Sequence, residues 1–330
     1  MAVMSNSMCV TPSLASFSTD NSLTSHVGDT SYISYTTEKV TLTLDPDMKK
    51  QFGADQANNL LLFESRHLSL FSSLVAKEGI SCSFHVTSAY DVCTTPVMAV
   101  KGKAAFHERR QDFPEAMAPY LELRTPEEVQ RLSGVKDGLW GCVYKVGSIH
   151  PYDFANGLME RALVMSREGG GSINVQTRTS VLSVKHDSTW TVETDRGNVT
   201  TPKVLLATNA YTSFLLPEMA EKIVPICEAV ASFLPPPEPK AGTPSLERMR
   251  PFSTSYSLKY SPGLFDYMIS RQEGKREVVL GGAQEVYVDD RKSWMGTVDD
   301  NKILCVGSEQ ERRRKVVVPF IIRGLTIDLE

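Results

Sequence analysis

The sequence lacks several patterns that would point to particular classes of protein. No apolar run approaches the ~20 residues needed to cross a bilayer. The six cysteines include no CxxC pair, and the six histidines lack the spacing of zinc ligands, so no metal site is predicted. A net charge of −4 gives no electrostatic footprint for nucleic acid or for an anionic membrane surface. We therefore expect a soluble, cytoplasmic protein that binds neither nucleic acid nor membranes.

The scattered cysteines favour reduced thiols over a disulfide framework in a chain of this length. The alternative is a bridge between Cys82 and Cys93, which flank a predicted strand. Single buried cysteines usually behave as small hydrophobes, so the reduced form is the main expectation.

Residues 1–38 contain no lysine or arginine and are crowded with serine and threonine. Mitochondrial transit peptides are rich in arginine, and secretory signals need an apolar core, so neither label fits. The composition predicts a disordered or loosely attached segment over residues 1–45.

The rest of the chain alternates between helical and strand patterns, and 330 residues suffice for two domains. Apolar residues at helical spacing predict helices over 46–79, 97–110, 125–132 and 153–168. Alternating patterns predict strands over 80–92, 173–184, 190–194, 199–207, 223–234, 254–260, 265–271 and 277–280. Residues 222–283 are predicted to form an antiparallel sheet, interrupted by a proline-rich loop at 235–244. Glycines at 141 and 147 predict an irregular passage over 141–152.

The most informative stretch is VLLATNAYTSFLL, residues 204–216. A short apolar strand ends at Ala207, and Thr208 and Asn209 then turn the chain towards a helix. Open α/β sheets bind ligands beyond such strand ends. The alternative is that Thr208 and Asn209 only cap the following helix.

The order of elements resembles the second half of the FAD-binding domain in the D-amino-acid oxidase-like (DAO) family of FAD-dependent oxidoreductases. The resemblance lies in a helix, a strand, a hairpin with Asp195 to Asn198 at its turn, and a strand ending in Ala-Thr-Asn-Ala. It implies an α/β fold, in which an incomplete Rossmann-like FAD-binding domain is interleaved with an antiparallel-sheet substrate domain. The implied division is 46–80 and 141–221 for the FAD-binding part, 81–140 and 222–303 for the substrate part, and 304–330 for a divergent tail.

The resemblance also implies residues near FAD. Gly147 and His150 lie in a Gly-x-x-x-Pro segment like the one that brings the family's backbone close to the flavin. Val181 corresponds to a strand residue whose backbone contacts adenine, and Ala207, Thr208 and Asn209 match the turn facing the dinucleotide. The alternatives are that Gly147 shapes a turn and that His150 is a hydrogen-bonded structural residue.

On the substrate side, the candidate residues are Tyr256, Tyr260, Tyr267 and Arg271, the last of which could clamp a carboxylate in a bidentate manner. The alternative is that they are ordinary strand residues facing solvent. Gly281 and Gly282 match a glycine pair at the end of a family strand, and Asp299 and Asp300 match the acidic pair that follows it. No catalytic residue is assigned.

Two features of the family are missing. The sequence has no Gly-x-Gly-x-x-Gly segment, whose backbone holds the pyrophosphate of FAD, and no matching last flavin-binding strand. The main hypothesis is an FAD-dependent oxidoreductase that oxidises an amine or amino-acid-like small molecule. The alternative is a non-catalytic or truncated member of the same family acting as a binding protein, and a second chain completing the fold is a further possibility.

Overall fold

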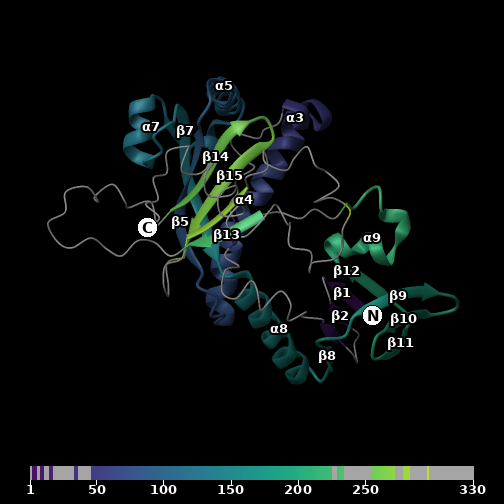
Figure 1. The fold of residues 1–330 in the computed structure, drawn as a ribbon. Helices are drawn as coiled ribbons and strands as arrows, with labels where there is room; N and C mark the ends of the chain where they lie inside the picture. The colour runs from purple at the N-terminus through teal and green to yellow at the C-terminus, as the bar shows by residue number, and fades with distance from the viewer. Residues whose placement is uncertain are drawn as a thin grey trace. The chain divides into compact units, whose positions relative to one another are not determined.

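A computed structural model describes residues 2–5, 8–10, 15–17, 33–35, 46–224, 229–233, 254–271, 278–282 and 296 (Figure 1). The chain divides into two compact units. The first unit comprises Met1–Asp29, Ala155–Cys227 and Asp290–Cys305, and the second comprises Thr30–Phe154, Glu228–Asp289 and Val306–Glu330. The predicted proline-rich loop, the pair Asp299 and Asp300, and the tail at 304–330 lie outside the described residues.

A mixed sheet organises the second unit, in the order β13-β16-β15-β14-β5-β7-β4, with β6 also paired to β7 (Figure 1). Its strands are β4 (Ile33–Tyr35), β5 (His85–Cys93), β6 (Leu121–Leu123), β7 (Trp140–Ile149), β13 (Ala229–Phe233), β14 (Ser255–Ser261), β15 (Leu264–Ser270) and β16 (Val278–Gly282). Strands β13 to β16 pair antiparallel, which confirms the antiparallel sheet predicted there. A single parallel pair, β14 with β5, joins that sheet to the antiparallel β5 and β7.

Strand β7 corrects the prediction of an irregular passage over 141–152. It pairs with β5 over nine residues, and the glycines lie where neighbours come close. A Cβ on Gly141 would lie 2.5 Å from the carbonyl oxygen of Asp91, and one on Gly147 would lie 2.9 Å from the ring of Phe84. These glycines permit close packing inside a regular strand, a role that sequence alone does not distinguish from a loop.

The predicted helices are confirmed, with two differences. The helices are α3 (Pro46–Phe52), α4 (Ala54–Glu78), α5 (Pro96–Asp112), the short α6 (Pro114–Met117), α7 (Pro126–Ser133) and α8 (Pro151–Glu168). The single helix expected over 46–79 is two helices separated at Gly53, whose φ of 81° breaks the helical path, and α6 was not predicted. Helix α4 ends at Gly79, whose φ of 64° is the left-handed conformation that glycine adopts without strain. Helix α7 begins at Thr125, whose hydroxyl accepts a hydrogen bond from the backbone N–H of Glu128 at 3.2 Å.

Both faces of the sheet are buried. On one face, Tyr256, Leu258, Met268 and Leu280 pack with Val129 of α7. On the other face, the strand residues Ala89, Cys93 and Tyr144 pack with Met98 and Phe106 of α5. The sheet is therefore the centre of a layered core, with α5 and α7 contributing to different faces (Figure 1).

Cys82, Cys93 and Cys142 are free and buried, in agreement with reduced thiols and against a bridge between Cys82 and Cys93. Burial, with the charge of Asp91 adding to it, raises the pKa of Cys93 to about 12. This thiol is therefore protonated at neutral pH, as expected for a packing residue.

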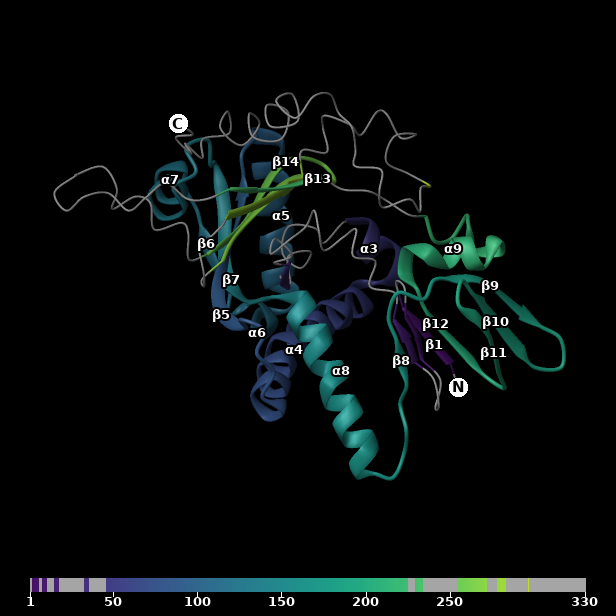
Figure 2. The same ribbon diagram turned by 60° about the horizontal axis from the view of Figure 1, so that its bottom comes forward.

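The first unit holds two smaller sheets (Figure 2). One has the order β12-β1-β2-β3-β8 and the other β11-β10-β9. The strands are β1 (Ala2–Ser5), β2 (Met8–Val10), β3 (Ala15–Phe17), β8 (Val175–Gln176), β9 (Val181–His186), β10 (Trp190–Thr194), β11 (Gly197–Thr201) and β12 (Val204–Ala207). After β12 come the 3-10 helix η1 (Asn209–Tyr211), α9 (Thr212–Leu215) and the 3-10 helix η2 (Pro217–Met219).

The predicted hairpin is confirmed as β10 and β11, with Gly197 at a φ of 130° where the chain turns. Val192 on β10 is fully buried and packs with residues from β9, β11, β12 and α9, among them Val184, Val199, Leu206 and Leu215. The hairpin sheet and the strand β12 therefore share one small core.

The first 45 residues contain strands β1 to β4, which differs from the disorder predicted for them. Strand β1 lies parallel to β12, with Ser5 opposite Ala207. The physical reason is that strands from elsewhere in the chain supply backbone partners, a long-range effect that local composition does not reveal. The two units are defined by their compactness, whereas the predicted FAD-binding and substrate parts are defined by the ligand that each would bind. That division stays a prediction.

The two glycines of β7 give a matched pair of substitutions. We expect Gly141→Ala to lower the free energy of unfolding by about 1–3 kcal/mol, because the new methyl group meets the backbone of β5. Gly147→Ala should cost less, because the atoms it meets belong to the side chains of Phe84 and Leu68, which can move. Urea denaturation measures both, and equal losses would contradict the argument.

Candidate functional site

The turn after β12 has the geometry of a ligand-binding edge. Strands β12 and β1 are parallel and end together at Ala207 and Ser5, and ligands in open α/β sheets bind beyond such ends. Thr208 is buried, and its hydroxyl lies 2.8 Å from that of Thr212. Asn209 is exposed at a φ of 41°. Neither η1 nor α9 has a side-chain cap, so the capping alternative for Thr208 and Asn209 is not what the structure shows.

The strand beside β12 does not lead into a phosphate site. Only two residues separate β1 from β2, and β2 returns antiparallel to β1. A dinucleotide-binding fold needs a glycine-rich turn and a helix N-terminus at this point, where backbone amides hold the pyrophosphate. The described residues at this edge could therefore line one side of an FAD site, but they provide no glycine-rich turn or helix N-terminus to bind its phosphates.

Val181 begins β9 opposite Thr194, next to a β-bulge, and its side chain contributes to the core of the first unit. Its predicted contact with adenine is through the backbone and is compatible with that position. Val181, Ala207, Thr208 and Asn209 all belong to the first unit.

Gly147 and His150 belong to the second unit and have clear structural roles. Gly147 makes room for the ring of Phe84. His150 is buried, and its backbone N–H donates to the carbonyl of Cys82 at 2.8 Å. Its Nδ1 lies 3.3 Å from the backbone N–H of Asp153 and 2.9 Å from the Asp153 carboxylate, so the ring holds the first turn of α8.

The four residues predicted on the substrate side lie on the sheet but are not gathered on one face. Tyr256 is 1% exposed, stacks on Tyr90 and donates its hydroxyl to the carbonyl of Ser133 at 3.1 Å. Tyr260 donates to Asp266 at 3.4 Å. Tyr267 lies on the face opposite to Tyr256, because it is paired with Ser257.

The ring of Tyr267 lies over Gly281, where a Cβ would be only 2.0 Å from Cζ. Gly281 therefore provides the space that this ring occupies. Arg271 directly follows β15. Tyr256 is committed to the core, whereas Tyr267 and Arg271 are half-buried.

A buried charged cluster on the same face as Tyr267 was not predicted. It consists of Asp91 on β5 with Ser257 and Lys259 on β14, and all three are at most 4% exposed. Asp91 lies opposite Ser257, and the hydroxyl of Tyr144 donates to Asp91 Oδ1 at 3.2 Å. The ammonium of Lys259 lies 4.1 Å from the centre of the Phe265 ring. We call these residues, with Tyr144, the Asp91 cluster.

Burial raises the pKa of Asp91 to about 6, although the charge of Lys259 and the hydrogen bond from Tyr144 act in the opposite direction. Asp91 Oδ2 is buried and has no hydrogen-bond partner among the described residues. Strongly shifted pKa values next to a specific charged partner are typical of functional sites, although structural networks produce them too. Because Asp91 is fully buried, it would act through Lys259 and Tyr144 rather than touch a ligand.

The sequence carried a partial signal for this cluster. Asp91 interrupts an apolar strand, and Ser255, Ser257 and Lys259 alternate with apolar residues along β14. Such alternation predicts a polar face in solvent. That face is buried because helix α5 packs over it, and the pairing of β14 with β5 brings Ser257 and Lys259 into the same covered face.

Comparisons with known proteins agree with this fold. The family described as "DAO: FAD dependent oxidoreductase" matches residues 40–310. No curated protein matches the sequence. Among solved structures, glycine oxidase from Bacillus cereus ATCC 14579 is 13% identical with a TM-score of 0.52, over 80% of this chain and 64% of that one.

Two further structures are similar. Glycine oxidase from Geobacillus kaustophilus is 17% identical with a TM-score of 0.51, over 68% of this chain and 55% of that one. L-proline dehydrogenase from P. horikoshii is 16% identical with a TM-score of 0.50, over 78% of this chain and 60% of that one. The chain thus spans less than two thirds of the length of these proteins, and identities this low establish the fold alone.

In the part of the chain that is described, no helix is long and apolar enough to cross a membrane. The same residues contain no group of three or more His, Cys, Asp or Glu side chains arranged to hold a metal ion.

The raised pKa of Asp91 gives a prediction about pH. The native carboxyl keeps its proton up to about pH 6, whereas the unfolded one loses it near 3.8, so this residue makes stability fall as pH rises through that window. Relative to wild type, Asp91→Asn should therefore gain up to about 3 kcal/mol of stability between pH 4 and pH 7.

Denaturant unfolding across this pH range measures the effect. Asp137→Asn is the control, because Asp137 is an exposed aspartate of the same unit. A stability difference between Asp91→Asn and wild type that does not change with pH would contradict the prediction.

Proposed function

Since the chain belongs to the DAO family of FAD-dependent oxidoreductases, we propose that it takes part in oxidising an amine or an amino-acid-like small molecule. The observation that carries the proposal is the family match over residues 40–310. The structural neighbours, two glycine oxidases and an L-proline dehydrogenase, support a substrate with an oxidisable carbon next to nitrogen. FAD, when bound, supplies the acceptor for a hydride from that carbon.

The second unit is proposed to bind the substrate. Arg271 would bind a substrate carboxylate through two parallel hydrogen bonds, which a planar guanidinium forms and an ammonium cannot. Tyr267 would present its ring from the neighbouring part of β15. Within the Asp91 cluster, the carboxylate of Asp91 would hold the ammonium of Lys259 on the same face of the sheet as Tyr267. Tyr256 and Tyr260 would then act by supporting the sheet.

The turn after β12 is proposed as the wall for the adenosine end of FAD. Of the two polar side chains in this turn, Asn209 is exposed, whereas Thr208 is buried and hydrogen-bonded to Thr212. Val181 would contribute backbone only. Gly147 and His150 would act at a distance, by positioning β7 and the start of α8.

A second candidate function is favoured by the return of β1 into β2. Without the amide nest, several charge-assisted hydrogen bonds to the pyrophosphate, about 1.5–3 kcal/mol each, would be missing. A chain with that deficit would bind FAD weakly and would act as a non-catalytic binding protein of the family, or would need a second chain to complete the phosphate site.

Flavin binding separates these candidates. The purified chain is incubated with excess FAD, passed over a desalting column and examined for flavin absorbance. Bound flavin in a stoichiometric amount supports the oxidoreductase. Absence of flavin, also after refolding with FAD, would refute FAD binding by this chain alone. Flavin that is retained only with a co-purifying polypeptide would support completion by a second chain.

If FAD binds, Asn209→Gly should weaken the affinity by about tenfold, which corresponds to one lost hydrogen bond of about 1.4 kcal/mol. Glycine tolerates the positive φ of this position, so the backbone is preserved. Asn198→Gly, at an exposed site on β11, is the control and should leave the affinity unchanged. Quenching of FAD fluorescence measures both. Equal affinities in the two variants would remove Asn209 from the site.

A further inference from the structure

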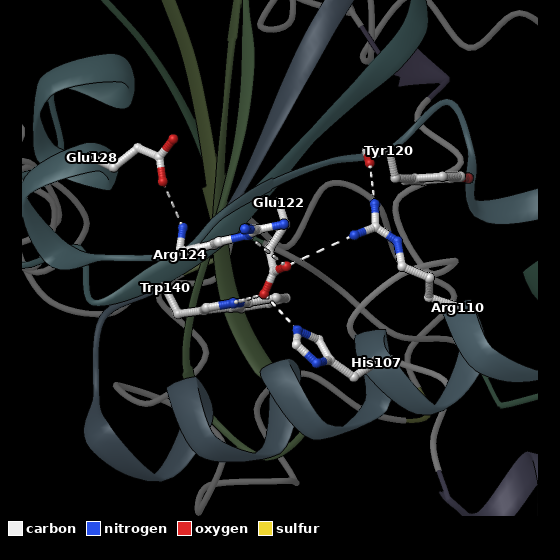
Figure 3. Close-up of polar contacts among 7 residues, drawn as sticks. All are labelled: His107, Arg110, Tyr120, Glu122, Arg124, Glu128 and Trp140. Atoms are coloured by element: carbon white, nitrogen blue, oxygen red, sulfur yellow. Dashed lines mark hydrogen bonds and ion pairs between the residues drawn. The ribbon is translucent and has the colours of Figure 1, made fainter. Parts of the chain in front are cut away.

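A surface cleft of about 520 Å³ in the second unit is lined by six residues, four of which carry or can carry positive charge. Helix α5 and the end of β6 form it, and Figure 3 shows its central contacts. We call it the Glu122 cleft. The lining residues are Lys103, His107, Arg110, Gln111, Glu122 and Arg124.

Glu122 is the anchor of this cleft. Its side chain is 4% exposed, and three groups donate hydrogen bonds to it. The Trp140 indole N–H reaches Oε1 at 3.2 Å, His107 Nε2 reaches Oε1 at 2.6 Å, and Arg124 Nε reaches Oε2 at 3.3 Å. Burial alone would raise the pKa of Glu122, but the hydrogen bonds from His107 and Trp140 and the charges of His107 and Arg124 outweigh it, and the pKa is lowered. Glu122 is therefore ionised, and it accepts three hydrogen bonds from the residues around it.

Arg110 is held in place by contacts other than Glu122. Its Nη2 donates to the carbonyl of Tyr120 at 3.0 Å, and its guanidinium lies 4.7 Å from the centre of the Phe106 ring. Arg110 Nη1 is 3.8 Å from Glu122 Oε2, too far for a hydrogen bond. The guanidinium of Arg110 is thus held beside the carboxylate of Glu122, which accepts its hydrogen bonds from other donors.

The positive charge exceeds what Glu122 requires. Lys103, Arg110 and Arg124 contribute three positive charges against one negative charge. The side chains of Lys103 and Gln111 make no hydrogen bond or ion pair with any other described residue. The side chain of Arg124 is 71% exposed, and its backbone N–H is tied to Glu128 Oε2 at 2.8 Å. Glu128 is the other carboxylate drawn in Figure 3, and its Oε2 accepts the hydrogen bond from the backbone N–H of Arg124.

From this geometry we propose that the Glu122 cleft binds an oxyanion, the phosphate or carboxylate group of a small anionic ligand. The guanidinium of Arg110 is held by fixed contacts, that of Arg124 is exposed and bound to Glu122 through Nε, and the ammonium of Lys103 lines the same cleft. These are the donors that oxyanions favour. The alternative role, neutralisation of Glu122 alone, accounts for His107, Trp140, Arg124 and the ion pair with Arg110, but it leaves the positive charges in excess and the side chain of Lys103 without a hydrogen-bond or ion-pair partner among the described residues. The site lies outside the predicted flavin and substrate residues, so it does not depend on the proposed oxidation.

The test measures binding of inorganic phosphate to the full chain by isothermal calorimetry at constant ionic strength. Wild type should show saturable binding. Lys103→Gln and Arg124→Gln should each weaken it by about tenfold, the effect of one lost charge-assisted hydrogen bond. Lys101→Gln is the control, because Lys101 is an exposed lysine on the same helix but does not line the cleft.

Lys103→Gln keeps the test decisive if Arg124→Gln fails to fold, because the Lys103 side chain has no hydrogen bond or ion pair with a described residue to lose. Titration with a phosphate monoester and with a dicarboxylate distinguishes the two sources of the oxyanion, and binding of either that is sensitive to Lys103→Gln supports the site. Absence of saturable binding by all three anions, or an identical loss in Lys101→Gln, would overturn the proposal.

Discussion

The second unit depends on the antiparallel pairing of β5 with β7. These two strands exchange backbone hydrogen bonds over nine residues, and β7 also pairs with β4 and β6 on its other edge. The same strand carries Trp140, which binds Glu122, and Tyr144, which binds Asp91. Both the buried cluster and the surface cleft are thus positioned by side chains that alternate along β7, and a slip of its register by one residue would displace both.

The two charged groups of this unit show how burial and partners compete. Asp91 has one hydrogen bond and a nearby ammonium, and burial still dominates, so its pKa rises. Glu122 has three hydrogen-bond donors, and they dominate, so its pKa falls. Both carboxylates lie in the same sheet, but Asp91 is completely buried whereas Glu122 lies at the edge of a surface cleft. The deeper burial of Asp91 and the larger number of donors at Glu122 together account for the opposite directions of the two pKa shifts.

Sequence reasoning located the parts of the fold that local patterns determine. The helical spacing of apolar residues gave α4, α5 and α8, the turn at Gly197 gave the hairpin, and alternation gave β14 to β16. It missed β7 because glycines that allow close packing look like glycines that break a strand. It also missed the pairing of β1 with β12 and the burial of Lys259 beneath α5, because both depend on elements far apart in the chain. Lys103, His107 and Arg110 share one face of α5 by their spacing, but their counterpart Glu122 comes from β6, which only the fold brings near.

The buried cysteines Cys93 and Cys142 also allow local opening of the second unit to be measured. Cys93 and Cys142 are fully buried, and the thiol of Cys93 is held in its unreactive protonated form. An alkylating reagent reacts only with a thiolate that it can reach, so modification of these residues requires α5 to move away from this face of β5 and β7. The rate of alkylation at each thiol therefore reads the free energy of opening at that strand, as amide hydrogen exchange does for the backbone.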